Sequence, residues 1–286
     1  MEIHRLSPGH PAWPEALSHA FPPPEGLFLR GTLPVRPGVA VVGTRKLSPY
    51  GRACVELLVP EIVRLGRPVV SGLALGIDGV AHAAALASGG VTLAVLGSGI
   101  DDGSIYPRAH AGLAARILAS GGGILSEYPS GMPGLPHHFP ARNRIVAALS
   151  SAVLLIEAPR KSGAMITARL ALEMGREVWA VPGPITQPNA EGPNDLIRNG
   201  ATPITCADDI AHALGMKPRQ ERLPMPPALS PDERAAIEAI AAGHDTADAL
   251  AKALGRPVTA VSALLTALEL SGAIRTVGGG RHTLYT

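Results

Sequence analysis

Cysteine and aromatic residues are scarce in this chain of 286 residues, and each shortage excludes a class of protein. The two cysteines, Cys54 and Cys206, have neither CxxC nor zinc-ligand spacing. We therefore expect reduced packing residues and no disulfide framework. With 2 Trp, 4 Tyr and 3 Phe, the chain has too few aromatics for an extended stacking platform.

Long apolar runs and nucleotide-cofactor motifs are also missing. No segment has the length of a membrane span and no apolar leader stands at the N-terminus, so we expect a cytoplasmic protein without a membrane partner. No Walker A pattern and no sustained GxGxxG follow the first predicted strand, which argues against NTP or NAD as a cofactor. His82, His137 and His138 have no third ligand at a recognisable spacing, so we expect no metal and no other cofactor.

The composition indicates a folded protein with balanced charge. Hydrophobic residues make up 46% of the chain, 33 Gly and 28 Pro supply many turns, and the formal net charge is +2. The 21 Arg and 4 Lys fit a bias in genome composition, although arginine also offers the planar fork that suits phosphate. Net charge alone therefore does not indicate nucleic-acid binding.

Residues 38–215 alternate between short apolar runs and helical patterns. Strands are expected at residues 39–42, 68–71, 91–96, 123–127, 153–156, 178–181 and 202–204, and helices at 49–65, 76–88, 107–120, 142–150, 163–174, 194–199 and 208–214. Continuous apolar strands separated by helices are typical of a parallel sheet that is covered on both faces. We predict an α/β fold with an extended Rossmann-like, doubly wound parallel sheet.

The remaining segments differ from this alternating region. Residues 1–37 are rich in proline and are interpreted as a lead-in segment, and residues 216–228 as an extended linker. Residues 229–286 combine three helical patterns with a hairpin around three glycines, which predicts a small C-terminal winged-helix domain.

Small residues and cations follow several predicted strands at their carboxyl ends. In doubly wound sheets this edge binds ligands. The segments are Gly43-Thr44-Arg45-Lys46 with Arg52, residues 71–78, residues 97–99, Tyr128-Pro129 with the later Phe139-to-Arg144 stretch, and Arg160 to Gly163 with Thr167. Residues 38–215 hold 14 Arg and Lys against 13 Asp and Glu, so the positive character comes from placement. Such a rim suits phosphate, since glycines admit close backbone approach and cations neutralise charge.

The stretch from Phe139 to Ser150 departs from a local rule. Arg142, Asn143 and Arg144 stand at the expected start of a helix, where the macrodipole normally favours Asp or Glu. Guanidinium groups beside free N–H groups suit an anion such as phosphate. The alternative is that these arginines simply point into water.

These stretches resemble the DprA/Smf family of DNA-processing proteins of bacterial natural transformation. The resemblance runs in order from about residue 10 to residue 215, and the tail resembles the family's winged-helix domain. Its motifs are Val41-Val42-Gly43-Thr44-Arg45, Ser71 to Asp78 with Ala81-His82, Ser126 to Pro129, Phe139 to Ile145, Lys161 to Ala168, Gly175 to Val178, Val181-Pro182-Gly183 and Glu191 to Asn194.

The resemblance implies a homodimeric single-stranded DNA-binding protein that assists loading of RecA recombinase. By position, it implies that Gly43, Thr44 and Arg45 form a phosphate-gripping loop, that Phe139 stacks on a base, that Arg142 and Asn143 bind backbone, and that Ser162, Gly163 and Thr167 line the same pocket. Arg52, Arg144 and Lys161 join the candidate DNA-binding residues from their place at the rim. Relatives often carry a lysine shortly before the Phe-Pro pair, where this chain has Leu135-Pro136-His137-His138.

An enzyme of the same fold is the alternative hypothesis. LOG-type nucleotide phosphoribohydrolases place a catalytic glutamate near the fifth strand, whereas here no carboxylate follows Thr167 until Glu173. A general base is missing where that chemistry needs it, so we expect no enzymatic activity. Asp78 and Glu127 are interpreted as hydrogen-bonding residues that hold loops.

Overall fold

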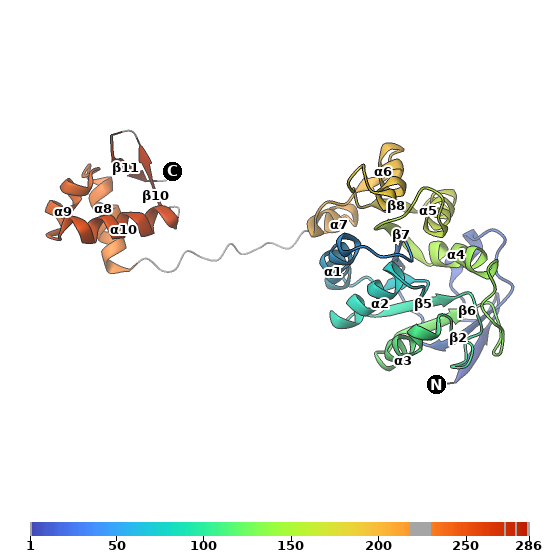
Figure 1. Cartoon of the computed structure of the whole chain (residues 1–286). Coiled ribbons are helices and arrows are strands. Elements are labelled where there is room, and N and C mark those ends of the chain that lie inside the picture. The colour runs from blue at the N-terminus through green and yellow to red at the C-terminus, as the bar shows by residue number, and fades with distance from the viewer. Residues whose placement is uncertain (1, 218–229, 272, 278, 285–286) are drawn as a thin grey trace. The chain divides into compact units, whose positions relative to one another are not determined.

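The computed structural model describes residues 2–217, 230–271, 273–277 and 279–284. The chain divides into two compact units, Met1–Arg219 and Gln220–Thr286 (Figure 1).

The first unit is built on a nine-stranded sheet in the order β1-β2-β6-β5-β4-β3-β7-β8-β9. From β6 to β9 all neighbouring strands are parallel, whereas β2 runs antiparallel to both β1 and β6. The strands are β1 (Ile3–Leu6), β2 (Leu27–Gly31), β3 (Gly38–Val42), β4 (Val69–Ser71), β5 (Thr92–Leu96), β6 (Gly123–Ser126), β7 (Ser150–Leu155), β8 (Glu177–Ala180) and β9 (Thr202–Pro203). The predicted Rossmann-like α/β class is confirmed.

Residues 1–37 contribute more than the lead-in segment that the sequence predicts. They add β1, β2 and a 3-10 helix η1 (Glu15–His19), and β2 pairs directly with β6. Leu27 and Leu29 of β2 are buried while Phe28 and Gly31 are half-buried. This short segment lies between prolines, and its pairing with β1 and β6 makes it a strand.

Helices cover both faces of the sheet, because the central strands are buried at every position and successive side chains point to opposite faces (Figure 1). Apolar residues of α4, α5 and the first thirty residues pack on one face, and those of α1, α2, α3 and α7 pack on the other. The helices are α1 (Pro49–Arg64), α2 (Ile77–Ala87), α3 (Ala111–Ala119), α4 (His138–Ala148), α5 (Gly163–Glu173), α6 (Glu191–Arg198) and α7 (Ala207–Ala213), with 3-10 turns η2 (Arg108–His110) and η3 (Pro188–Ala190).

Helix α4 begins four residues earlier than the sequence predicts. It starts at His138, so Pro140 lies in the first turn, where its missing N–H has no intrahelical partner to lose. Arg142, Asn143 and Arg144 consequently lie in the second turn. The prediction that these residues stand at the helix start, against the macrodipole, is wrong.

The second unit has the predicted winged-helix elements. It contains α8 (Pro231–Ala241), α9 (Ala247–Leu254), α10 (Val258–Leu270) and the hairpin of β10 (Ile274–Val277) with β11 (Arg281–Leu284). A capping box between Ser230 and Glu233 starts α8, and Gly255 ends α9 in the left-handed region at φ 62°. Most of the predicted linker, residues 218–228, lies outside the described residues.

Within the described ranges, no single helix has both the length and the apolar composition of a membrane span. Helices α9 and α10 reach that threshold only when they are counted together across a bend of 112°.

Candidate functional site

A cavity of about 400 Å³ opens at the carboxyl end of β3. The chain adds strands from β3 through β4 and β5 to β6 on one side, and from β7 to β9 on the other. The strand order therefore reverses between β3 and β7, and ligands of doubly wound sheets bind at such a switch point.

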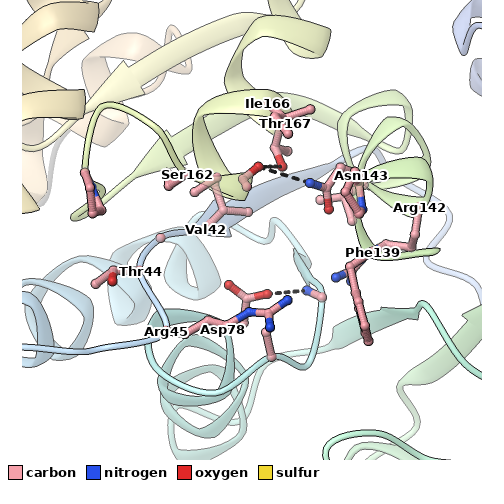
Figure 2. A pocket seen from close by; sticks show the side chains of 18 of the residues that line it. Val42, Thr44, Arg45, Asp78, Phe139, Arg142, Asn143, Ser162, Ile166 and Thr167 are labelled. Atoms are coloured by element: carbon pink, nitrogen blue, oxygen red, sulfur yellow. Dashed lines mark hydrogen bonds between the residues drawn. The ribbon is translucent and has the colours of Figure 1, made fainter. Parts of the chain in front are cut away.

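Nine of the twelve predicted site residues line this cavity. They are Gly43, Thr44, Arg45, Phe139, Arg142, Asn143, Ser162, Gly163 and Thr167. They come from the loop after β3, from α4 and from the start of α5, so segments more than a hundred residues apart meet at one place (Figure 2).

The loop after β3 holds its backbone against β7 and sends one cation outward. Thr44 N–H donates to the Glu157 carbonyl at 2.6 Å, and a Cβ on Gly43 would lie 2.8 Å from that same oxygen. Only glycine fits this close approach. The Arg45 side chain is exposed, and its guanidinium carbon lies 5.2 Å from the centre of the Phe139 ring, within cation–π distance.

Arg142 lies at the buried base of the cavity, with 4% of its surface exposed. Its Nη1 donates to the Val95 carbonyl, and a Cβ on Gly72 would overlap its guanidinium group. Burial lowers the pKa of Arg142 to about 10, against the favourable charge of Asp78, so the group is still a cation at neutral pH. Burial likewise raises the pKa of the Asp78 carboxyl, while the charge of Arg142 opposes that shift.

Asp78 holds the loop between β4 and α2. Its Oδ2 accepts from the Gly72 N–H at 3.1 Å, which agrees with the predicted role in loop structure (Figure 2). The same loop contains Leu73, a buried residue at φ 58°, and its carbonyl lies 2.8 Å from His110 Nδ1. A left-handed conformation is costly for leucine, so the surrounding contacts define the shape of this loop.

The third wall is the N-terminus of α5. Ser162 caps this eleven-residue helix by accepting from Met165 N–H at 3.4 Å. Asn143 Nδ2 at 3.1 Å and Thr167 Oγ1 at 3.4 Å both donate to the Gly163 carbonyl (Figure 2). The positive end of the α5 dipole thus faces the cavity beside Arg45 and Arg142, an arrangement that favours anions.

The other three predicted residues do not line this cavity. Arg144 donates to both carboxylate oxygens of Glu127 at 2.6 Å and to the Pro22 carbonyl at 2.6 Å, which ties α4 to β6 and to the first residues of the chain. Arg52 faces Glu56 at 3.6 Å on α1, and Lys161 is exposed in the turn before α5. Contact of these three residues with DNA remains a prediction.

The candidate DNA-binding residues did not include several residues that shape the cavity, although Gly72 and Pro140 lie within the predicted strand-end segments. Gly72, Pro136, Pro140 and Ile166 line it. The available signals were two prolines near Phe139 and a glycine directly after a predicted strand. None of these three residues carries a charge or a hydrogen-bonding side chain. Their role follows from packing, which sequence spacing does not reveal.

Among the described residues, no group of three or more His, Cys, Asp or Glu side chains is arranged to hold a metal ion. The charged side chains that line the cavity are those of Arg45, Arg142 and Asp78.

Fold and site define a two-domain protein in which a Rossmann-like unit with an arginine-lined cavity at the strand switch point is joined to a winged helix. A family profile described as DNA recombination-mediator protein A matches residues 4–215, and a DprA winged helix domain profile matches residues 220–280. The chain belongs to the DprA/Smf family.

Relatives and solved structures agree with this assignment. Protein Smf of Escherichia coli is 43% identical over 269 residues, covering 90% of this chain and 71% of that protein. DNA processing protein DprA of Bacillus subtilis is 42% identical over 208 residues, covering 72% of this chain and 68% of the relative.

Two solved structures share the fold. DNA processing protein A of Streptococcus pneumoniae has a TM-score of 0.69 at 40% identity, covering 74% of each chain. Its Helicobacter pylori counterpart, described for its single-stranded DNA binding mode, has a TM-score of 0.66 at 31% identity, covering 74% of this chain and 95% of that one.

Proposed function

We propose that this protein binds single-stranded DNA in the cavity at the β3–β7 switch point. In the proposed complex, Arg45 and the N-terminus of α5 hold backbone phosphates, Phe139 stacks on a base, and Arg142 and Asn143 complete the backbone contacts. The single-stranded DNA binding described for the Helicobacter pylori relative supports the ligand class.

The observation that carries the proposal is the pairing of Arg45 with Phe139 at the cavity. The guanidinium carbon lies 5.2 Å from the ring centre, so a cation and an aromatic ring lie next to each other at the cavity. Single-strand binding without sequence preference combines these two elements, because phosphate carries charge and every base has a π face. Among the described residues, Arg45 has no acidic partner in an ion pair.

We also propose that the cavity is not catalytic. Asp78 is the carboxylate among the described lining residues, and it is buried and accepts a hydrogen bond from Gly72. Glu157 lies two residues after β7, but its Oε1 accepts from Ser48 Oγ at 2.6 Å and its Oε2 from Ser48 N–H at 3.2 Å, at the start of α1. Both of these described carboxylates serve loop structure, so neither is placed as a general base.

The family description as a recombination mediator supports a wider proposal. We propose that the bound strand is protected and passed to RecA recombinase during natural transformation and recombination, and that the protein works as a homodimer.

Arg45→Ala tests the site. If about four phosphates are neutralised, the log–log dependence of affinity on salt has a slope near −3 on single strands. We expect Arg45→Ala to weaken binding to all sequences about equally and to flatten that slope by nearly one contact. The measurement is fluorescence anisotropy of labelled oligonucleotides at several salt concentrations, beside gel shifts with duplex DNA.

Arg116→Ala is the matched control, because Arg116 is exposed on α3 and does not line the cavity. Equal affinities and equal salt slopes for a folded Arg45→Ala protein and this control would refute the proposed site.

A further inference from the structure

A second cavity of about 710 Å³ adjoins the first. Pro140 and Ile166 line both cavities, so these two residues form the partition between them. The second cavity lies between the segment that leads into β2 and the start of α4. The ion pair of Arg144 with Glu127 is part of its wall.

The second cavity is unusually aromatic for this chain. Phe21, Phe28 and Tyr128 line it, and Phe139 lines the first cavity, so all 3 Phe of the sequence belong to one of the two sites. Phe21 is 86% exposed, whereas an isolated side chain of this size is normally buried. Tyr128 is held in place by stacking on His138, with ring centres 3.8 Å apart.

The charges of the second cavity fit a base better than a phosphate. The Arg144 guanidinium is neutralised by Glu127 at 2.6 Å, and the remaining charged groups are Arg5 and Glu25, one of each sign. The Arg5 side chain makes no hydrogen bond or ion pair with any described residue, and the Glu25 side chain is exposed. A donor and an acceptor beside aromatic rings match the edge and the faces of a nucleobase.

We propose that this second cavity is a nucleobase subsite, in which Phe21 stacks on a base of the strand whose backbone occupies the first cavity. The inference rests on the proposed function. Because Pro140 and Ile166 line both cavities, the two cavities are adjacent, and in the proposed complex a strand held beside Arg45 places a neighbouring base against Phe21.

The test combines a side-chain deletion with a base deletion. Affinities are measured for oligo-dT strands of about ten nucleotides that carry one abasic site, moved along the strand position by position. For the wild-type chain, we expect an abasic site at the stacked position to weaken binding about five- to tenfold. Phe21→Ala weakens binding of the intact strand by the same factor, and the abasic site then costs no further affinity.

Two variants serve as controls. Ile185→Ala removes an apolar side chain that is 93% exposed and lines neither cavity, and we expect it to leave affinity unchanged. Phe21→Trp keeps an aromatic face and retains the binding. Since Phe21 is exposed, neither substitution at this position disturbs the core.

The outcomes separate this inference from the proposed function. If Phe21→Ala keeps the strand affinity while Arg45→Ala weakens it, the base subsite alone is overturned. If Phe21→Ala then abolishes binding of a protein ligand, the second cavity is assigned to a peptide. Unchanged affinity in both variants overturns the proposed function itself. If the loss of affinity from Phe21→Ala adds to the loss from an abasic site at every position of the strand, the stacking contact is also overturned.

Discussion

At the residue scale, burial decides what each arginine near the cavity does. Arg45, Arg142 and Arg144 all stand in motifs that suit phosphate, yet only Arg45 is exposed. Arg142 is packed against Gly72 and donates to Val95, while Arg144 is committed to Glu127 and Pro22. Arg144 has its donors in use, and Arg142 is buried at the base of the cavity, so Arg45 is the phosphate contact that the geometry supports best.

A buried histidine beneath the site provides a test of the electrostatics at the same scale. The His82 side chain is fully buried, and its Nδ1 lies 2.7 Å from Thr92 Oγ1, which itself donates to the Val69 carbonyl. The imidazole is thereby assigned as an Nδ1–H donor. Burial, with the charges of His110 and Arg142, lowers the pKa of His82 to about 3.

This shift makes stability depend on pH. In the unfolded chain His82 takes up a proton as the pH falls below its ordinary pKa of 6.5, whereas the folded chain does not until about pH 3. Unfolding therefore becomes easier over that window, by about 1.4 kcal/mol for each pH unit. We expect His82→Asn, which keeps a donor toward Thr92, to remove this dependence.

Urea unfolding of the wild type and of His82→Asn at pH 6.5, 5.5 and 4.5 measures the difference. Only the change with pH is compared, because the substitution also lowers stability by itself and because the Asp78 carboxyl titrates in both proteins. Parallel pH profiles for the two proteins would contradict the assignment of a neutral, buried imidazole.

At the scale of elements, the loop between β4 and α2 fixes the base of the cavity. Gly72 follows β4 directly, Leu73 is held at φ 58°, and Gly76 lies at φ 81° just before α2. The guanidinium of Arg142 packs in the space that a side chain at position 72 would fill. The loop and helix α4 therefore determine each other's positions.

We predict that Gly72→Ala displaces Arg142. The added methyl group overlaps the guanidinium, and overpacking of this kind costs about 1 to 3 kcal/mol of stability. Single-strand affinity should fall about tenfold, or ~1.4 kcal/mol, because the cavity base moves. Anisotropy and urea unfolding give the two numbers.

Gly112→Ala is the control for this substitution. Gly112 is exposed in α3, and a Cβ there meets nothing within 4 Å, so alanine should stabilise the helix by up to about 1 kcal/mol without changing affinity. Unchanged single-strand affinity in Gly72→Ala would show that binding does not depend on the position of Arg142 at the bottom of the cavity.

At the scale of the whole molecule, the two units differ in where their cations lie. Residues 229–286 carry 5 Lys and Arg against 6 Asp and Glu, a net charge of −1. Helix α10, which stands in the place of a recognition helix, has no cation, and its Val261, Leu265 and Leu268 are buried in the domain's own core. Arg256 pairs with Asp232 at 2.5 Å, so one candidate phosphate ligand is already neutralised.

We therefore expect the winged helix to contribute little to strand binding, since binding to DNA depends chiefly on cations. A chain that stops after Lys217 should bind single strands with a loss of less than about tenfold, or ~1.4 kcal/mol, relative to the full chain. The comparison needs circular dichroism and sedimentation data to establish that the shortened chain is folded and has the same oligomeric state. A collapse of binding in such a chain would assign the DNA to the other domain.

Much of the architecture was determined by the sequence itself. Apolar runs such as Val39 to Val42 and Val153 to Ile156, separated by helical patterns, specify parallel strands because strands buried on both faces have no polar alternation. The glycine and arginine after β3 and the motif around Phe139 likewise indicated one site, since parallel strands present their carboxyl ends at the same edge.

The tertiary structure alone decided which of these residues are free to act. Nothing in the sequence distinguishes Arg45 from Arg144, because both are arginines in small-residue motifs, and only the fold brings Glu127 within 2.6 Å of one and Phe139 beneath the other. The strands within residues 1–37, the start of α4 at His138 and the cavity beside Phe21 are likewise products of long-range pairing. Local propensity specifies elements, whereas burial and the use of each donor depend on neighbours that are distant in the chain.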